Sequence, residues 1–367
     1  MEGSGLLGRS EASPAMPLHV LLACHNRRDL TVRAISTFAD AAAALGADAD
    51  FTVFDDGSTD GTAEALAALD VPITRIAGDG SAFWSRSMAE AEAHVLHAHD
   101  DDGYIVWLND DVELDGDFLE IALSAADSAP RAVLVGGMRD PETGELTYSG
   151  QQRGGLHPLN FAPIEPNGTL QPVETFNGNL VFVPFEVARA LGGIDGSLSH
   201  TGADTDYGFR VCEAGFSLLL LPRIVGSCAY NPDPPVGPVM GDWRMFVGVK
   251  SGGNYNTMKR ILRKRHPRTW LGYIFVTYSL WWARRLAYIT THASSGVVVQ
   301  AVGDESPGAR YSPAGVGPTL MNASEKPETE LPSVNYLDAK RRRRRARLHR
   351  PSVGSRDCQG RPRHDRP

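Results

Sequence analysis

Short apolar runs alternate with helical patterns between Pro17 and about Pro130. Four runs show no strict alternation of apolar and polar residues: LHVLLA (18–23), FTVF (51–54), VPITRI (71–76) and YIVWL (104–108). This is the pattern of strands that are buried on both faces. Between the runs, apolar residues recur at helical spacing in 29–45, 59–69 and 82–98. The order predicts successive right-handed βαβ units, and therefore a mostly parallel sheet covered by helices on both faces.

Polar residues follow three of these runs. The clusters are HNR (25–27), DDGSTD (55–60) and NDD (109–111). The carboxyl ends of neighbouring parallel strands lie along one edge of a sheet, and open α/β sheets bind their ligands there. We therefore expect the three clusters to gather on one edge and to form a binding site.

The second half of the chain is less regular. The predicted elements are strands at 132–137 and 176–184, a helix around 185–193, a helix from about Asp204 to Gly215, and the apolar run SLLLLP at 217–222. The Gly- and Pro-rich stretch 139–172 is typical of a surface excursion with turns, and a further loop begins around 231–238.

Residues 258–292 form a basic, aromatic segment of predicted helix. Its apolar stretch, 270–283, is about 14 residues long and too short to span a bilayer. Basic flanks and Trp residues near the ends are typical of a helix in a membrane interface, and a core or oligomer helix is the alternative. The composition predicts a disordered basic tail at 293–367 and a flexible N-terminus at 1–16.

Charge is unevenly distributed over the 367 residues. The stretch 340–367 has 12 basic and 2 acidic residues, whereas residues 1–339 carry a net charge of −18. Because an acidic body is a poor ligand for nucleic acid, we expect no nucleic-acid partner. The arginine run 340–350 is typical of a solvated tail without a specific partner. The alternative is that it binds anionic lipid or RNA.

Cysteine usage and the first residues indicate the compartment. The four cysteines form no C-x-x-C pair, which argues against a zinc ribbon or a disulfide scaffold and suits a reducing environment. The start of the chain lacks the basic and long apolar regions of a signal peptide. We expect a cytoplasmic protein. The basic, aromatic segment adds the expectation of a peripheral position at the inner face of the cell membrane.

The segment FDDGSTDGT (54–62) is the first that suggests chemistry. A carboxylate at a strand end can accept hydrogen bonds from a base N–H or from ribose hydroxyls, and Gly57 permits close approach. Alternatively, Asp55, Asp56 and Ser58 only cap the next helix.

The segment WLNDDVEL (107–114) places two acids directly after an apolar strand. Adjacent carboxylates are costly there unless a positive charge lies nearby. Mg²⁺ or Mn²⁺ takes one or two carboxylates together with phosphate oxygens, so a metal with a diphosphate fits this pair. A solvated acidic turn is the alternative.

The segment GADTDYGFR (202–210) places Asp204 and Asp206 at a helix start, where the helix dipole favours carboxylates. The alternative for one of these aspartates is that it only caps the helix. A base that deprotonates a sugar hydroxyl needs such a carboxylate facing the donor.

These clusters, in this order, resemble family 2 glycosyltransferases over about residues 17–270. The matching segments are ACHNR (23–27), FDDGSTDGT, WLNDDVEL and GADTDYGFRVCEAG (202–215). GDGSAFWSRSM (78–88), FNGNLVFVP (176–184) and SHTGADTDYGFR (199–210) look like the branch that contains rhamnosyltransferase-like enzymes.

The resemblance implies a GT-A fold over 17–257, in which a Rossmann-like nucleotide-binding half joins a mixed acceptor-binding half. It implies that Asp56 holds the base or ribose, beside the turn at His25 and Asn26. The metal triplet begins with Asn109, so Asp111 is the implied ligand for Mg²⁺ or Mn²⁺ and Asp110 its helper.

The same resemblance assigns the catalytic base to Asp204, although Ala203 stands where the family usually has Glu. Asp206 and Arg210 are expected to support that helix and loop. Four further residues are candidates: Asp79 and Trp84 for the nucleotide, His266 for the diphosphate and His200 for the acceptor. The alternative for Trp84 and His266 is a structural role.

The expected activity is an inverting transfer of sugar from a nucleotide-diphosphate donor, dTDP-rhamnose or a UDP-sugar. The expected acceptor is a hydroxyl of a glycan or lipid-linked molecule in cell-surface polysaccharide synthesis. The alternatives are a nucleotidyltransferase and a non-catalytic relative that binds a sugar nucleotide. A nucleotidyltransferase is disfavoured because no glycine- and basic-rich triphosphate loop follows the first strand.

Overall fold

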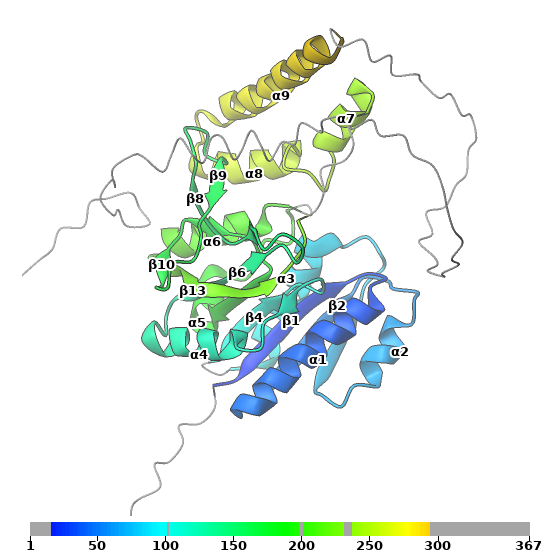
Figure 1. The fold of residues 1–367 in the computed structure, drawn as a ribbon, viewed down its shortest axis with the longest axis vertical. Helices are drawn as coiled ribbons and strands as arrows, with labels where there is room; N and C mark the ends of the chain where they lie inside the picture. The colour runs from blue at the N-terminus through cyan, green and yellow to red at the C-terminus, as the bar shows by residue number, and fades with distance from the viewer. Residues whose placement is uncertain (1–15, 101–102, 199–200, 231–236, 294–367) are drawn as a thin grey trace, which may run out of the picture. The chain divides into compact units, whose positions relative to one another are not determined.

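The computed structural model describes residues 16–100, 103–198, 201–230 and 237–293 (Figure 1). Its first half has the predicted alternation of strands and helices. The elements are β1 (Leu18–Cys24), α1 (Arg28–Leu45), β2 (Ala49–Asp55), α2 (Thr62–Ala67), β3 (Ile73–Ala77), α3 (Phe83–Ala98) and β4 (Tyr104–Leu108). Strand β1 pairs in parallel with both β2 and β4, and β3 continues the parallel sheet beside β2.

The second half completes the same sheet. Its elements are β5 (Glu113–Leu114), α4 (Phe118–Ser128), β6 (Val133–Arg139), β12 (Leu180–Pro184), α5 (Phe185–Leu191), α6 (Ala203–Glu213) and β13 (Leu218–Ser227). With β10 (Gln171–Pro172) at one edge, the strand order is β10-β13-β6-β12-β4-β1-β2-β3. Strand β12 lies antiparallel between β4 and β6, so the sheet is mixed but mostly parallel, as predicted.

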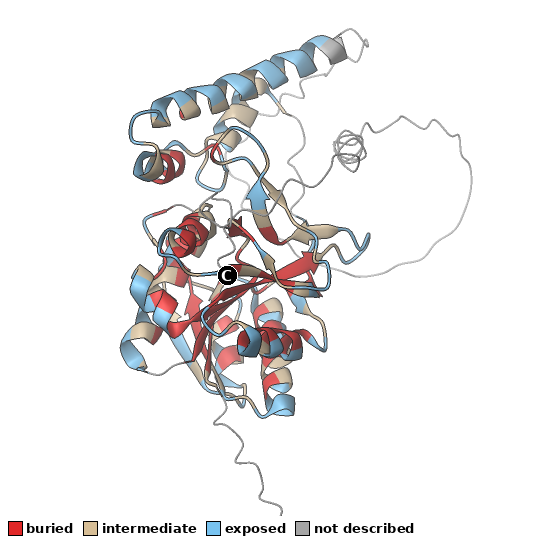
Figure 2. Ribbon diagram, turned by 90° about the vertical axis from the view of Figure 1, so that its left-hand side faces the viewer, coloured by how far each residue is buried: buried red, intermediate tan, exposed pale blue. Residues whose placement is uncertain are grey.

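The sheet separates two apolar layers, and successive residues of each strand alternate between them. On β4, Val106 packs in the layer with α1 and α4, whereas Ile105 and Trp107 pack in the layer with α3, α5 and α6. Figure 2 shows the buried strands between helices that are buried on one side only. Burying a side chain of this size contributes about 1.5–3 kcal/mol, which fixes the register of the strands and hence the positions of their ends.

The stretch 139–172, expected as a surface excursion with turns, contains short strands as well. These are β7 (Leu146–Tyr148), β8 (Gly150–Arg153), β9 (Phe161–Pro163) and β10 (Gln171–Pro172). Strand β8 pairs with β9 and with β11 (Thr175–Phe176) in a separate three-stranded sheet. The expectation of turns alone was incomplete because these strands are too short to show a pattern in sequence.

Residues 258–292, expected as one helical segment, belong to two helices. The helices are α8 (Tyr255–Arg265) and α9 (Trp270–Ala293), preceded by α7 (Val239–Phe246). Pro267 explains the break, because proline disfavours helical conformation in the preceding residue and has no N–H to donate. The expected boundary at 257 therefore falls inside α8, whose Ile261 packs in the same layer as α6.

The chain divides into two compact units after Leu286, and the described part of the second unit is 287–293, the end of α9. The predictions for 1–16 and 293–367 concern residues that, apart from Met16 and Ala293, lie outside those described. Within the described ranges, no helix is both long and apolar enough to cross a membrane.

Candidate active site

Asn26 joins the turn after β1 to the turn after β2 through hydrogen bonds, both donated and accepted. Its backbone N–H donates to Oγ of Ser58 at 2.9 Å, and its Oδ1 accepts from the backbone N–H of Thr59 at 2.8 Å. Asn26 has a φ of 51°, a left-handed conformation that asparagine adopts more readily than most residues. Nδ1 of His25 lies 2.5 Å from the carbonyl oxygen of Asp56. The predicted meeting of the first two clusters is confirmed.

The two acids of DDGS have different surroundings. Asp55 is buried and forms an ion pair with Arg75 at 2.9 Å, so Arg75 balances the negative charge of this buried carboxylate. Asp56 is also buried, and its carboxylate accepts backbone N–H groups of Gly80 at 2.9 Å, Ala82 at 3.0 Å and Phe83 at 3.1 Å. Asp56 therefore fixes the loop that leads into α3.

That loop approaches the DDGS turn so closely that side chains are excluded. Gly57 has a φ of 73°, and a Cβ there would lie 2.9 Å from the backbone nitrogen of Gly80. The loop ends at Phe83, whose φ of 55° is strained for an aromatic residue. Strain at this point is offset by the hydrogen bonds to Asp56.

Asp79 and Trp84 flank the same loop. Asp79 is exposed, and the hydroxyl and backbone N–H of Ser81 donate to its carboxylate, which lowers its pKa. Trp84 donates its Nε1–H to Oδ1 of Asn109 at 2.9 Å and packs edge-on against Trp107. Trp84 therefore joins the start of α3 to the NDD cluster, whereas Asp79 is an exposed residue of the loop before α3.

The NDD cluster meets the first cluster through Arg27. One nitrogen of its guanidinium, Nη1, lies 2.9 Å from Oδ1 of Asp110 and 3.0 Å from Oδ2 of Asp111. The side chain of Asp110 is 7% exposed and that of Asp111 37%. Burial, with a contribution from the neighbouring Asp111, raises the pKa of Asp110 to about 6 despite Arg27. All three strand-end clusters thus gather on one edge, as predicted.

A divalent cation at this edge would have two carboxylates as protein ligands. Within the described part of the chain, the group of three His, Cys, Asp or Glu side chains close enough to share an ion is His19, Asp50 and His99. That group lies at the starts of β1 and β2, at the opposite edge of the sheet. Asp110 and Asp111 fit Mg²⁺ or Mn²⁺ only where a donor diphosphate and water complete the coordination.

The fourth motif reaches this edge through the FNGN segment. Asp204 lies in the first turn of α6, where its carboxylate accepts backbone N–H groups of Thr205, at 2.7 Å, and Gly178. Burial raises the pKa of Asp204. A Cβ on Gly178 would lie 3.1 Å from the ring of Trp84, so a side chain there would press against this indole. The segment 177–179 thus connects Asp204 to the residues that hold Asn109.

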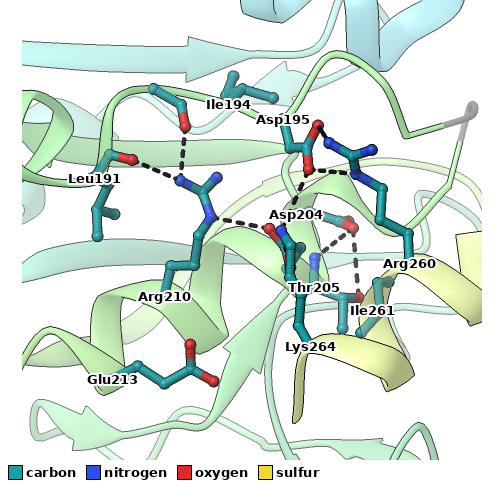
Figure 3. Close-up of polar contacts among 12 residues, drawn as sticks. Leu191, Ile194, Asp195, Asp204, Thr205, Arg210, Glu213, Arg260, Ile261 and Lys264 are labelled. Carbon is teal, nitrogen blue, oxygen red and sulfur yellow. Dashed lines mark hydrogen bonds and ion pairs between the residues drawn. The ribbon is translucent and has the colours of Figure 1, made fainter. Parts of the chain in front are cut away.

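Asp206 points in a different direction, toward α8. It is fully buried and lies 2.9 Å from Nε of Arg210 and 3.0 Å from Nη1 of Arg265. Arg210 also donates to the carbonyl oxygens of Leu191 and Gly193, as Figure 3 shows for the loop after α5. Asp206 and Arg210 therefore tie α6 to α8 and to that loop.

Candidate His266 is not placed with these carboxylates. His266 follows α8 and lines a cavity of about 280 Å³ with Arg153, Phe209 and Arg265, at the far end of α6 from Asp204. No residue of the strand-end clusters is part of that lining. Burial lowers the pKa of His266. His200 lies outside the described residues.

Sequence patterns did not single out Arg27, Gly178 or Cys228. Sγ of Cys228 lies 3.8 Å from Oδ1 of Asp111, and burial followed by the charge of Asp111 raises the pKa of this thiol to about 12. Arg27 lies in the quoted segment HNR and Gly178 in FNGN, so the sequence contained a signal for these two residues. Nothing in the sequence marked Cys228, because it directly follows β13 and lies 117 positions from Asp111.

A mostly parallel sheet flanked by helices, with acidic residues gathered at its strand ends, is the arrangement of a GT-A fold. Residues 19–185 match the family model described as Glycosyl transferase family 2. Residues 19–185 therefore belong to a family 2 glycosyltransferase domain, and this part of the sequence-based identification is confirmed. No curated protein matches the chain.

Solved structures with similar folds include GalNAc-T7 with UDP, GalNAc and Mn²⁺, at 13% identity over 69% of this chain and 48% of that one, with a TM-score of 0.49. Residues 1–349 of TarS from S. aureus are 13% identical over 58% of this chain and 60% of that one, with a TM-score of 0.43. The mannosyltransferase PcManGT from Pyrobaculum calidifontis, in complex with GDP-Man and Mn²⁺, is 15% identical over 80% of this chain and 85% of that one, with a TM-score of 0.42. The chain thus spans less than two thirds of the first two.

Proposed function

We propose that this chain is an inverting glycosyltransferase that moves a sugar from a nucleotide-diphosphate donor to a hydroxyl of a glycan or lipid-linked acceptor. One observation carries the proposal. The Arg27 bridge to Asp110 and Asp111 lies at the same sheet edge as the loop held by Asp56. This arrangement offers hydrogen-bonding groups for a nucleoside beside charged groups for a diphosphate.

The nucleoside would bind along the turn after β1 and the loop before α3. Because Asp56 already accepts three backbone N–H groups, we propose that it shapes this surface in addition to any contact with base or ribose. His25, Asn26 and Asp79 are exposed and offer donors and acceptors to it. Trp84 closes the side toward the NDD cluster.

The diphosphate would bind next to Asp110 and Asp111. Mg²⁺ or Mn²⁺, held by Asp111 with Asp110 as its helper, would stabilise the charge that develops on the departing nucleoside diphosphate. Arg27 shares these carboxylates, and its guanidinium is the type of group that binds phosphate oxygens in pairs. We therefore propose that Arg27 contacts the diphosphate.

Asp204 would accept the proton of the acceptor hydroxyl. A carboxylate whose pKa is raised by burial is a better base near neutral pH than an ordinary aspartate. In a single displacement, the acceptor oxygen bonds to the anomeric carbon as the bond from that carbon to the diphosphate oxygen breaks. The configuration of the sugar is inverted.

We propose dTDP-rhamnose as the donor, with UDP-sugars next, and cell-surface polysaccharide synthesis as the setting. The test is to incubate the full chain with a panel of nucleotide sugars and Mn²⁺ or Mg²⁺, and to measure released nucleotide by chromatography. We expect release from one donor class, dependent on Asp204. A chain that binds a sugar nucleotide and never releases its nucleotide, with or without glycan acceptors, would instead be the non-catalytic relative.

A further inference from the structure

Helix α9 presents an uncharged, largely apolar face to solvent. Exposed positions between 270 and 286 recur at helical spacing and, apart from Arg284, are Leu271, Gly272, Phe275, Val276, Ser279, Leu280, Ala283 and Leu286. The five large side chains among them are 44–71% exposed. Figure 2 shows the same extensive exposure along α9. Several large apolar side chains together on one helix face mark an interaction surface rather than scattered surface residues.

The opposite face of α9 is held firmly by α7 and α8. Ile274 is buried against Met258 and Leu262 of α8. Arg285 forms an ion pair with Asp242 of α7 at 2.8 Å, and Trp243 packs against Trp281 and Trp282. The exposed face of α9, called here the outer face, is therefore displayed in a fixed direction by a packed three-helix group.

The charge of this group is opposite to that of the rest of the domain. Residues 239–286 contain ten Lys and Arg and one Asp, whereas residues 1–238 contain 12 basic and 35 acidic residues. Five of the cations are exposed and form no ion pair with any described residue: Arg244, Lys250, Arg263, Arg268 and Arg284. Arg268 precedes α9 and Arg284 borders the outer face near its other end.

We propose that the outer face of α9 docks on an anionic lipid bilayer, with its apolar side chains in the interface and the surrounding cations at the headgroups. An apolar face bordered by basic residues, on a helix that does not span, is the pattern of interfacial membrane helices. Acidic headgroups supply the charge that ten basic residues attract. A symmetric contact with a second copy would instead bring two such positive groups together.

The docking surface would place the domain at a membrane, which suits a lipid-linked acceptor. That consequence rests on the proposed function, but the docking itself requires no donor, acceptor or turnover. Failure of glycosyl transfer and failure of membrane binding are therefore separate results.

The test is co-sedimentation of the full chain with vesicles of phosphatidylcholine that contain phosphatidylglycerol, and with vesicles of phosphatidylcholine alone. We expect binding to the acidic vesicles, weakened by salt and much weaker without phosphatidylglycerol. Phe275→Glu combined with Leu280→Glu should lower the partition coefficient ~10-fold or more, because two large apolar groups no longer enter the interface.

Leu45→Glu is the matched control, since Leu45 is as exposed as Leu280 but lies at the end of α1. It should leave binding unchanged. Thermal unfolding and nucleotide release should be the same in both variants. Wild-type chain that stays in solution with acidic vesicles overturns the proposal. Light scattering that shows a dimer disrupted by the α9 substitutions also overturns it and identifies a second copy as the occupant.

Discussion

Nη1 of Arg27 lies 3.0 Å from Oδ2 of Asp111, although the two residues are 84 positions apart. Arg27 belongs to the turn after β1 and Asp111 to the turn after β4, which are neighbouring strands of the sheet. The same guanidinium nitrogen contacts Asp110. The chain itself therefore supplies one positive group beside these adjacent carboxylates.

Replacing Arg27 with Ala should lower kcat/KM by ~10²-fold, because a positive group near the developing charge of the leaving diphosphate is lost. Arg27→Lys should recover part of the rate, since a point charge replaces a guanidinium. Arg33→Ala is a matched control, because Arg33 pairs with the exposed Glu113 outside the site. Nucleotide release measures all three, and full activity of Arg27→Ala contradicts the assignment.

Asp111→Asn should raise the Mn²⁺ concentration needed for half-maximal activity by ~10-fold or more, because a neutral amide is a weaker ligand than a carboxylate. Glu113→Gln, two residues on and exposed, should leave that concentration unchanged. The measurement is a metal titration of nucleotide release, together with nucleotide affinity in Mn²⁺. Equal metal requirements in Asp111→Asn and wild type would sink the metal role of Asp111.

Asp204→Asn should lower kcat by ~10²–10⁴-fold with little change in the KM for the donor, because only proton transfer is lost. Burial raises the pKa of Asp204, and a base acts only when deprotonated. Wild-type kcat should therefore fall as the pH drops through that raised pKa. The residual activity of the variant should not show this fall at low pH. A kcat near wild type would rule out Asp204 as the base.

Asp206→Asn should destabilise the domain by about 3–5 kcal/mol, because Arg210 and Arg265 would lose their shared buried carboxylate. Asp117→Asn breaks a pair with Arg223 in which both side chains are roughly half exposed, and should have little effect. Denaturant unfolding at neutral pH compares them. An unchanged midpoint in Asp206→Asn would show that these contacts do not stabilise the α6–α8 junction.

Glu92 should make the domain less stable as the pH rises. It is fully buried, and burial raises its pKa from 4.5 to about 7. The folded state then binds more protons than the unfolded state between these values, so the free energy of unfolding falls across this window by about 3 kcal/mol. Glu92→Gln should flatten this dependence in urea unfolding measured from pH 4.5 to 7. A slope equal to that of wild type would assign the dependence to other groups.

The sequence determined the alternation of strands and helices in the first half, and with it the edge at which the polar clusters meet. Burial on both faces leaves a continuous apolar run, and parallel pairing brings strand ends together, so periodicity and connectivity suffice for both conclusions. Even the break between α8 and α9 has a local cause in Pro267.

Only the tertiary structure decided what each carboxylate contacts. Asp55 and Asp56 are adjacent in sequence, yet one pairs with Arg75 and the other holds the backbone of 80–83. Asp204 faces Gly178 while Asp206 faces α8, because neighbouring positions on a helix point in different directions. Such partners depend on side-chain packing between segments distant in sequence, which local patterns do not record.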